Sequence, residues 1–224
     1  EMVWLMTRGT RPDAAQAALF EAALVSAVDH GPQAPSIAAA RMAVSCGLPL
    51  NNAMATAINM LGDVHGGAGE QAMQFFHAVK SHAGTMSREA AIDLVFRENN
   101  QLVPGFGHRF HKNADPRSVR LMNLLEAAVA EKVCTGSFAE IAMAIEAYLY
   151  QQKGKAIPMN VDGVTAVIYA ELGFDPALAR GLFCLSRSVG VLAHAHEQAG
   201  RKERNKGPTP PHYLWTYGGD NPIK

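Results

Sequence analysis

The side chains best suited to chemistry gather in one fourteen-residue stretch, which spans Pro104–Arg117 and reads PGFGHRFHKNADPR. It holds two histidines, two arginines, a lysine and an aspartate, and its glycines and prolines favour a loop. Apolar, alanine-rich segments lie on both sides, and a polar loop between such segments is a common place for binding and catalysis. The same composition also fits a basic surface turn, so the loop indicates a functional site only if other segments supply partner residues.

Four further polar groups interrupt otherwise apolar segments. In order they are Asp29 with His30, His65 within the glycine-rich run Gly62–Gly69, Asn160 with Asp162, and Arg187 with His194. Arg187 and His194 are seven residues apart and therefore share one face of a helix. A buried guanidinium needs an anionic partner, which for Arg187 is either a protein carboxylate or the carboxylate of a substrate. A lone histidine at a helix end, by contrast, more often caps the helix or packs in the core.

Two common uses of such residues are disfavoured by their spacing. The histidines show no H-x-x-x-H or H-E-x-x-H zinc pattern, so no metal site is predicted. Gly62–Gly69 lacks the G-K-[ST] ending and the preceding strand of a phosphate-binding loop. Its glycines are better explained as positions where the backbone approaches a ligand closely.

Composition limits the class of protein. The chain has 224 residues, 48% hydrophobic content and no formal net charge, which suits one large or two small domains and argues against nucleic-acid binding. No apolar run reaches the roughly 18 residues that span a membrane. Three widely spaced cysteines without a C-x-x-C pair, and no visible signal peptide, favour a cytoplasmic protein. Because the chain starts at Glu1 within ordered-looking sequence, an N-terminal part is expected to be missing or disordered.

Helix-forming residues fill the periodic segments and β-branched alternation is scarce, so the fold class is expected to be all-α. Ser87 or Thr85 is expected to begin one helix, and Ser137 to cap another. The tail, Arg201–Lys224, is expected to be an extended arm. Helices are predicted over approximately Asp13–Val28, Ser36–Cys46, Leu50–Leu61, Glu70–Lys80, Ser87–Arg97, Ser118–Glu131, Ser137–Gln151, from the 159–163 segment to Leu172, and Pro176–Gly200.

The stretch PGFGHRFHKNADPR resembles the signature of the citrate synthase superfamily, in which G-[FH]-G-H is followed by a short variable run and D-P-R. The other polar groups resemble further elements of that family in the same order. Asp29-His30 resembles its D-H, VHGGAGE its L-H-G-G-A-N, PMNVDG its P-N-V-D, and the 187–197 run its R-x-x-G-x-x-A-H-x-x-E helix. Five ordered matches from Asp29 to Glu197 are far more specific than any one of them.

The resemblance implies a citrate-synthase-like fold with a large and a small helical lobe and an active site in the cleft between them. Residues 1–65 and 165–224 would form the large lobe, and residues 66–164 the small lobe that binds coenzyme A. The cleft would close over the substrates. A homodimer or higher homo-oligomer is expected.

The resemblance also implies residue roles. His65 would hold the thioester carbonyl, His108 would act on the keto or hydroxyl oxygen of the second substrate, and Asp162 would move the proton on the acetyl methyl carbon. The carboxylates of oxaloacetate or citrate would be bound by His30, Arg117 and Arg187. Coenzyme A would lie along Val103, Pro104, Gly105, Phe106 and Lys112. The coenzyme A thioester would be a substrate, and no permanently bound cofactor is expected.

General chemistry agrees with these roles. Enolising a thioester needs a base near the α-carbon and a hydrogen-bond donor at the carbonyl oxygen at the same time. A histidine at the start of a helix is kept neutral by the positive end of the helix dipole and can donate one hydrogen bond. A di- or tricarboxylate needs several cations, and arginine pairs with carboxylates in a bidentate manner.

Two departures from the family pattern direct the choice of reaction. The R-P-x-x-x-Y-x-G stretch, whose arginine reaches the partner subunit's site, is absent as such, although Arg204 or Lys206 could replace that arginine. Position 163 is glycine where synthases often have an aromatic residue, and N-V-D-G in a short chain resembles the citryl-CoA lyases and the lyase module of ATP-citrate lyase. Cleavage of citryl-CoA to acetyl-CoA and oxaloacetate is therefore expected. Synthesis of citrate or 2-methylcitrate, and a non-catalytic coenzyme-A-binding role, remain open.

Overall fold

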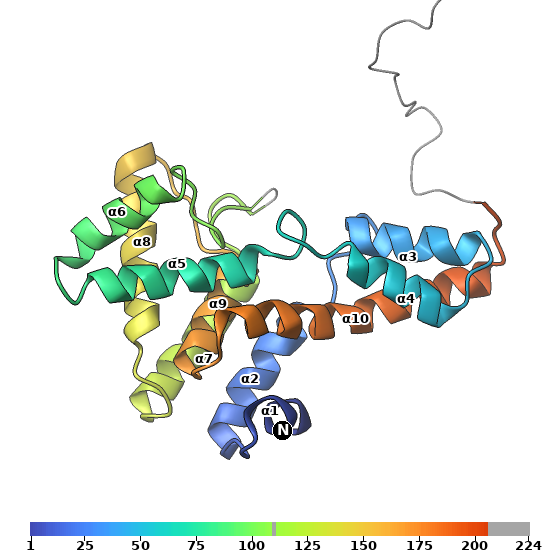
Figure 1. The fold of residues 1–224 in the computed structure, drawn as a ribbon, viewed down its shortest axis with the longest axis horizontal. Coiled ribbons are helices and arrows are strands. Elements are labelled where there is room, and N and C mark those ends of the chain that lie inside the picture. The colour runs from blue at the N-terminus through green and yellow to red at the C-terminus, as the bar shows by residue number, and fades with distance from the viewer. Residues whose placement is uncertain (109–110, 206–224) are drawn as a thin grey trace, which may run out of the picture.

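A computed structural model of the chain describes residues 1–108 and 111–205, and this part of the chain folds into ten α-helices (Figure 1). The prediction of an all-α fold is confirmed. The helices are α1 (Met2–Arg8), α2 (Ala14–Ser26), α3 (Pro35–Ser45), α4 (Leu50–Asn59), α5 (Ala68–His82), α6 (Arg88–Glu98), α7 (Pro116–Ala130), α8 (Ser137–Lys153), α9 (Val161–Glu171) and α10 (Pro176–Arg201).

Helix starts follow local hydrogen-bond chemistry. Asp13 and Gln16 form a capping box at the start of α2, in which each side chain accepts from the other residue's backbone N–H. Ser87 accepts from the N–H of Ala90 and so begins α6 as predicted. Ser137 does not cap α8, and that prediction is wrong. The residue before the helix is Gly136, in the left-handed conformation with φ 78°, and Ser137 is the first helical residue.

The predicted elements missed α1, because seven residues carry too weak a periodic signal. Tertiary contacts hold this helix. Trp4 is buried and packs edge-on against Phe20 of α2 and Phe174, with ring centroids 5.6 and 5.0 Å apart. Phe20 and Phe174 stack at 5.1 Å. These aromatic contacts hold α1 against α2 and Phe174.

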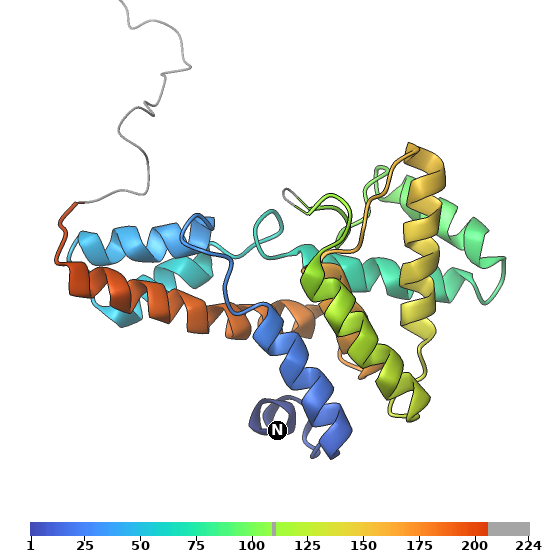
Figure 2. The ribbon, with the colours of Figure 1, turned by 180° about the vertical axis from the view of Figure 1, so that it is seen from behind.

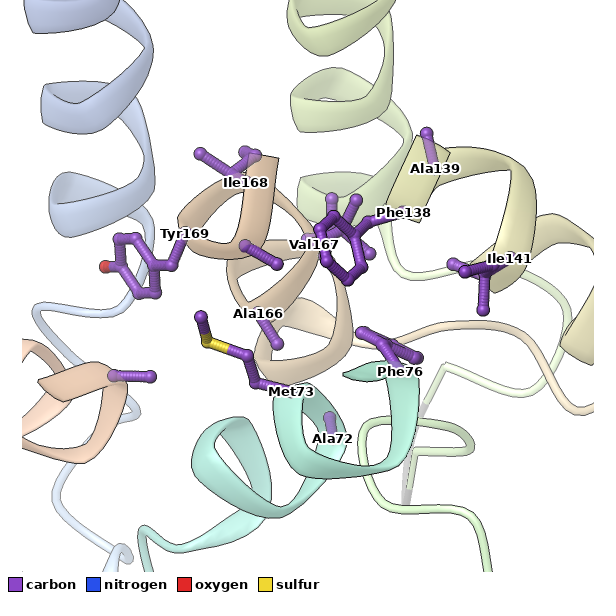
Figure 3. Close-up of a cluster of buried hydrophobic side chains, with 14 of the residues drawn as sticks. Ala72, Met73, Phe76, Phe138, Ala139, Ile141, Ala166, Val167, Ile168 and Tyr169 are labelled. Carbon is purple, nitrogen blue, oxygen red and sulfur yellow. The ribbon is translucent and has the colours of Figure 1, made fainter. Parts of the chain in front are cut away.

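Buried apolar side chains form two separate clusters. The larger joins α1 and α2 to α5–α9 and the first part of α10. Figure 3 shows its centre, where Met73 and Phe76 of α5 and Phe138 of α8 point towards Ala166 and Val167 of α9. The smaller cluster is built mainly of alanines from α3 and α4 with Val191 and Ala195 of α10. Small side chains let these three helices approach closely.

One long helix belongs to both clusters. In Figures 1 and 2, α10 runs along the molecule from α5 and α9 at one end to α3 and α4 at the other. A rigid α10 therefore fixes the positions of the groups that come from the two clusters. The lobe boundaries at residues 65 and 165 remain a prediction.

Membrane spans, metal groups and the tail residues can be assessed only within the described part of the chain. Within residues 1–108 and 111–205 no helix combines the length and apolar character needed to cross a membrane. The same residues contain no group of three or more histidine, cysteine, aspartate or glutamate side chains that could hold a metal ion. Arg204 lies beyond the end of α10 and is exposed, whereas Lys206 lies outside the described residues.

The start of α8 depends on an acidic side chain from another helix. Glu171, the last residue of α9, accepts from the backbone N–H groups of Gly136 (2.9 Å) and Phe138 (2.6 Å) and from the hydroxyl of Thr135 (3.1 Å). The carboxylate satisfies N–H groups that no helical carbonyl can reach and lies at the positive end of the helix dipole.

We expect Glu171→Ala to lower the free energy of unfolding by about 1–3 kcal/mol, because it leaves those N–H groups without an acceptor. Urea denaturation followed by circular dichroism measures the change. Glu140→Ala is the matched control, since Glu140 lies on α8 in an exposed ion pair with Arg88. It should change stability by less than about 0.5 kcal/mol. Equal effects of the two substitutions would show that Glu171 does not cap α8.

Candidate active site

Four segments that carry the predicted site residues meet beside the middle of α10. They are the end of α2, the break between α4 and α5, the loop between α6 and α7, and the start of α9 (Figures 1 and 2). The sequence predicted that these segments act together, and the structure places them together.

His65 is held in one tautomer by the start of α3. Its Nε2 accepts the backbone N–H of Ser36 at 3.2 Å and lies 3.0 Å from the Ser36 hydroxyl. Because Nε2 accepts a backbone N–H, the neutral ring carries its proton on Nδ1. Burial, followed by the charges of Arg187 and His30, lowers the pKa of His65. His65 is therefore a neutral imidazole with one N–H to donate.

The glycine break that carries His65 is fastened at both ends. Within it the N–H of Gly62 donates to the carbonyl of His65 at 2.9 Å, and Gly66 has φ 96°, a conformation that favours glycine. Arg180 of α10 pairs with Asp63 at 2.6 Å and also with Glu70. The loop is thus tied to α10 and cannot move without breaking these contacts.

The loop that carries His108 pairs with the segment before α9. Asn160 donates its backbone N–H to Gly105 (2.9 Å) and its side-chain N–H to Gly107 (2.8 Å), while Gly107 donates to Pro158 (2.7 Å). Gly105 and Gly107 both have positive φ, 82° and 81°. Asn160 also caps α9 through the N–H groups of Asp162 and Gly163. One asparagine therefore positions both the His108 loop and the helix that carries Asp162.

The two glycines at the crossing of these segments leave no room for side chains. A Cβ at Gly163 would lie 2.3 Å from the carbonyl oxygen of Gly105, and a Cβ at Gly105 would lie 2.6 Å from the Cα of Gly163. The glycine at position 163 is therefore required by the close approach of the His108 loop to α9.

His108 faces the other groups of the site. Its ring lies 6.0 Å from that of His30 and 4.6 Å from that of His111, between centroids. Its Nδ1 accepts the backbone N–H of His111 at 3.1 Å, so the neutral ring carries its proton on Nε2. Burial, followed by the neighbouring charge of His111, lowers the pKa of His108. His111 thus has a structural contact that the sequence did not predict.

Asp162 lies in the first turn of α9 and is half-buried. Burial raises the pKa of its carboxyl group, and the charges of Arg187 and Arg117 oppose that rise. A carboxyl group with a raised pKa binds and releases a proton closer to neutral pH than an exposed aspartate does. Proton transfer at carbon needs such a group.

The two arginines have different partners. Arg187 of α10 is only 4% exposed, donates from Nε to the carbonyl of Ala27 at 3.1 Å, and has no ion-pair partner among the described residues. Burial lowers its pKa, and the charges of Asp162 and Asp29 oppose this. Arg117 instead forms a bidentate pair with buried Asp115, at 3.1 Å from Nε and 2.9 Å from a terminal nitrogen. Of the two, Arg187 therefore lacks the anionic partner that its burial calls for.

The remaining predicted residues lie around this centre. His30 follows the end of α2, and burial, then the charges of Arg187 and Arg117, lower its pKa. Val103, Pro104, Gly105 and Phe106 form the part of the loop before His108, and Lys112 donates to the carbonyl of His108 at 3.3 Å.

Sequence reasoning missed three supporting residues: Ser36, Asp115 and Asn160 acting on the loop. Asp115 begins α7 by accepting the N–H of Arg117, and hydrogen bonds from Arg117 hold its pKa below the usual value although burial alone would raise it. The D-P-R order was a usable signal, because aspartate before proline at a helix start is a common cap. Ser36 gave no such signal, since its contact is with a residue 29 positions away.

Comparison with known proteins identifies the family. A family model described as the C-terminal domain of citrate synthase matches residues 1–208. The chain belongs to the citrate synthase family. The citrate synthase of Deinococcus radiodurans is 34% identical over 195 residues, which are 86% of this chain and 50% of that protein. The chain thus spans about half the length of the curated citrate synthases it matches.

Two solved structures of the family share the fold. A citryl-CoA lyase from Hydrogenobacter thermophilus is 32% identical, with a TM-score of 0.87 over 100% of this chain and 84% of that one. A citrate synthase from Thermoplasma acidophilum, in a ternary complex with carboxymethyl coenzyme A and oxaloacetate, is 26% identical, with a TM-score of 0.74 over 96% and 56%. The citrate-synthase-like fold expected from the sequence is confirmed.

Proposed function

We propose that this citrate synthase family member is a citryl-CoA lyase, which cleaves citryl-CoA to acetyl-CoA and oxaloacetate. The observation that carries the proposal is the arrangement of two neutral histidines and a carboxyl group of raised pKa around a buried arginine that has no ion-pair partner within residues 1–108 and 111–205. That set supplies a donor for a thioester oxygen, a group for a hydroxyl proton, a proton for carbon and a cation for a carboxylate.

In cleavage, the C–C bond breaks as the hydroxyl proton leaves and the electrons of the bond pass to the thioester as an enolate. His65 donates from Nδ1 to the enolate oxygen, so that the full negative charge is never unpaired. Asp162 then gives its proton to the enolate carbon, which forms the methyl group of acetyl-CoA. His108 receives the hydroxyl proton, and the freed oxygen becomes the keto group of oxaloacetate.

The tautomer of His108 adds a condition to this mechanism. A base needs a ring nitrogen without a proton, and the only such nitrogen in the neutral ring, Nδ1, accepts the N–H of His111. Receiving the proton at Nδ1 uses that lone pair, and receiving it at Nε2 requires a proton on Nδ1 first. In either case the bond between His111 and His108 opens during the reaction.

Substrate binding is proposed to use the remaining site residues. Arg187, His30 and Arg117 would bind the carboxylates, Arg117 through the N–H groups that Asp115 leaves unused. Coenzyme A would lie along Val103–Phe106 and Lys112, in a small lobe of residues 66–164. A homodimer is also proposed, and it is supported by an exposed apolar stripe on one face of α10 formed by Leu185, Val189 and Leu192.

Two observations favour cleavage over synthesis. The structure superposes on the Hydrogenobacter thermophilus citryl-CoA lyase with a TM-score of 0.87 and on the Thermoplasma acidophilum citrate synthase with a TM-score of 0.74. The aromatic residue that synthases often carry at position 163 would collide with Gly105 in the backbone arrangement of this chain. Citrate or 2-methylcitrate synthesis is the second candidate, because the curated relatives are citrate synthases. A non-catalytic, coenzyme-A-binding member is a third.

Incubation with citryl-CoA, and separately with acetyl-CoA and oxaloacetate, distinguishes these functions. We expect acetyl-CoA to form from citryl-CoA without free thiol, because the lyase breaks a C–C bond and leaves the thioester intact. Chromatographic separation of citryl-CoA from acetyl-CoA measures cleavage, and a thiol reagent measures free coenzyme A. Free thiol from the second mixture would indicate a synthase. Binding of coenzyme A without turnover of any acyl-CoA would indicate the non-catalytic member.

Asp162→Asn is expected to lower the turnover number by roughly 10²–10⁴-fold, the usual contribution of an acid–base group, because an amide cannot exchange the proton. Its thermal melting curve should remain cooperative, since asparagine has nearly the same shape. Single-turnover formation of acetyl-CoA measures the change. A rate within about threefold of the unsubstituted protein would remove Asp162 from the mechanism.

The pH dependence follows from proton counting. His65 and His108 must be neutral for cleavage, and the pKa of each is lowered from 6.5. Both histidines are therefore in the required form above pH 6.5, and activity is lost as the pH falls through their lowered pKas. Asp162 must be protonated, so activity falls again as pH rises through its raised pKa. We expect a bell-shaped profile of kcat/KM with its acid limb below pH 6.5.

Cleavage and synthesis should show the same two limbs. The reactive form for cleavage has Asp162 protonated and His108 neutral, whereas the reactive form for synthesis has His108 protonated and Asp162 ionised. The two residues together therefore bind one proton in either form, and the two forms respond to pH in the same way. Initial rates in buffers of constant ionic strength test the expectation. Limbs that differ between the two directions would mean that another residue transfers a proton.

A further inference from the structure

The segment Ala27–His30, which follows α2 and carries His30 of the candidate site, is fastened to α10. Three residues on one face of α10 contact the end of α2 and the residues that follow it. Ser186 donates to the carbonyl of Leu24 at 2.5 Å, and Arg187 donates to that of Ala27 at 3.1 Å. At Gly190 the backbones come so close that a Cβ would lie 2.2 Å from the carbonyl oxygen of Val28.

His194 is one turn further along the same face. Its Nε2 lies 3.1 Å from a carboxylate oxygen of Asp29, the residue before His30. Its Nδ1 is buried without a hydrogen-bond partner among the described residues, and the nearest carboxylate oxygen, on Glu197, is 3.9 Å away. A neutral ring with its proton on Nε2 therefore makes the one hydrogen bond open to it, to Asp29.

Glu197 is committed to other partners. It pairs with Arg41 of α3 at 2.8 Å and with Arg201 of α10 at 2.5 Å. The Asp29–His194 bond is therefore separate from the ion pairs that Glu197 forms with Arg41 and Arg201.

Asp29 lies where its carboxylate could compete with a carboxylate of the proposed substrate. Its side chain is 45% exposed and carries a negative charge beside His30 and near Arg187. Arg187 donates to the carbonyl of Ala27, two residues before Asp29, and the negative charge of Asp29 opposes the lowering of the Arg187 pKa by burial. A carboxylate free to turn towards Arg187 would compete with a substrate carboxylate for the same N–H groups.

We propose that His194 is a positioning residue that holds the Asp29 carboxylate away from Arg187, and thereby keeps the guanidinium available for the carboxylate of the substrate. The inference rests on the proposed function, since it assumes that Arg187 binds a substrate carboxylate. It assigns His194 an effect on the affinity for the di- or tricarboxylate and none on proton transfer. Asp29 would be harmful to binding whenever its partner is lost.

This inference predicts an unusual pattern in a double-substitution cycle. His194→Phe retains a ring of similar shape but donates no hydrogen bond, and we expect it to weaken oxaloacetate binding and to raise KM roughly tenfold, the scale of one lost charge-assisted contact. Asp29→Asn combined with His194→Phe should restore most of the affinity, because the amide has no negative charge to pair with Arg187. His194→Gln, which keeps an N–H donor, should stay within about threefold of the unsubstituted chain.

Isothermal titration with oxaloacetate and with citrate, and separate measurement of kcat and KM for citryl-CoA, provide the readouts. Glu197→Gln is the matched control, because it breaks the pairs with Arg41 and Arg201 but leaves the Asp29–His194 bond in place, and it should not change the affinity. Thermal melting checks folding. If His194→Phe melts far below the unsubstituted chain, His194→Ala takes its place in the same cycle.

The outcomes separate the inference from the proposed function. If the unsubstituted chain binds carboxylates but the double substitution is as weak as or weaker than His194→Phe, His194 has only a structural role and the inference is wrong. A loss confined to kcat would also overturn it. If the unsubstituted chain binds neither oxaloacetate nor citrate, the proposed function fails and the inference fails with it.

Discussion

The buried charge of Arg187 is the physical constraint on which the candidate site depends. A guanidinium that is almost inaccessible to water requires compensation, and in the described part of the chain it receives a backbone carbonyl and the face of Phe183, 4.9 Å away, but no paired carboxylate. Its field lowers the pKas of His30 and His65, which burial has already lowered, and limits the rise that burial gives to the pKa of Asp162. One cation thus influences the protonation of three neighbours at once.

Close backbone contacts make that arrangement possible. Gly190 lets the end of α2 rest directly on α10, which places His30 near Arg187. Gly163 and Gly105 let the His108 loop rest on the start of α9, the helix whose first turn carries Asp162. A Cβ would lie 2.2 Å from the other backbone at Gly190, 2.3 Å at Gly163 and 2.6 Å at Gly105, so at each crossing a side chain would push the two segments apart. The glycines therefore determine distances within the site although none of them has a functional group.

The sequence predicted the helices well because capping and proline signals coincide with apolar periodicity, as at Asp13 and Ser87. It predicted which polar segments belong together because the order of motifs matched a family. It missed α1, whose stability comes from Trp4 packing on distant aromatic rings, and it assigned the cap of α8 to Ser137 because Glu171, the actual acceptor, is more than thirty residues away. Local patterns specify local structure, whereas contacts between distant segments, such as Ser36 with His65, leave no trace in spacing.

The tautomers of the two histidines show how such distant contacts shape chemistry. A backbone N–H can only donate, so the N–H of Ser36 obliges His65 to keep its proton on Nδ1, and the N–H of His111 obliges His108 to keep its proton on Nε2. The first bond can persist throughout a reaction in which His65 only donates. The second has to break if His108 is to receive a proton. The structure therefore distinguishes the two histidines by their backbone partners: the proposed role of His65 is compatible with its bond to Ser36, whereas the proposed role of His108 requires its bond to His111 to open.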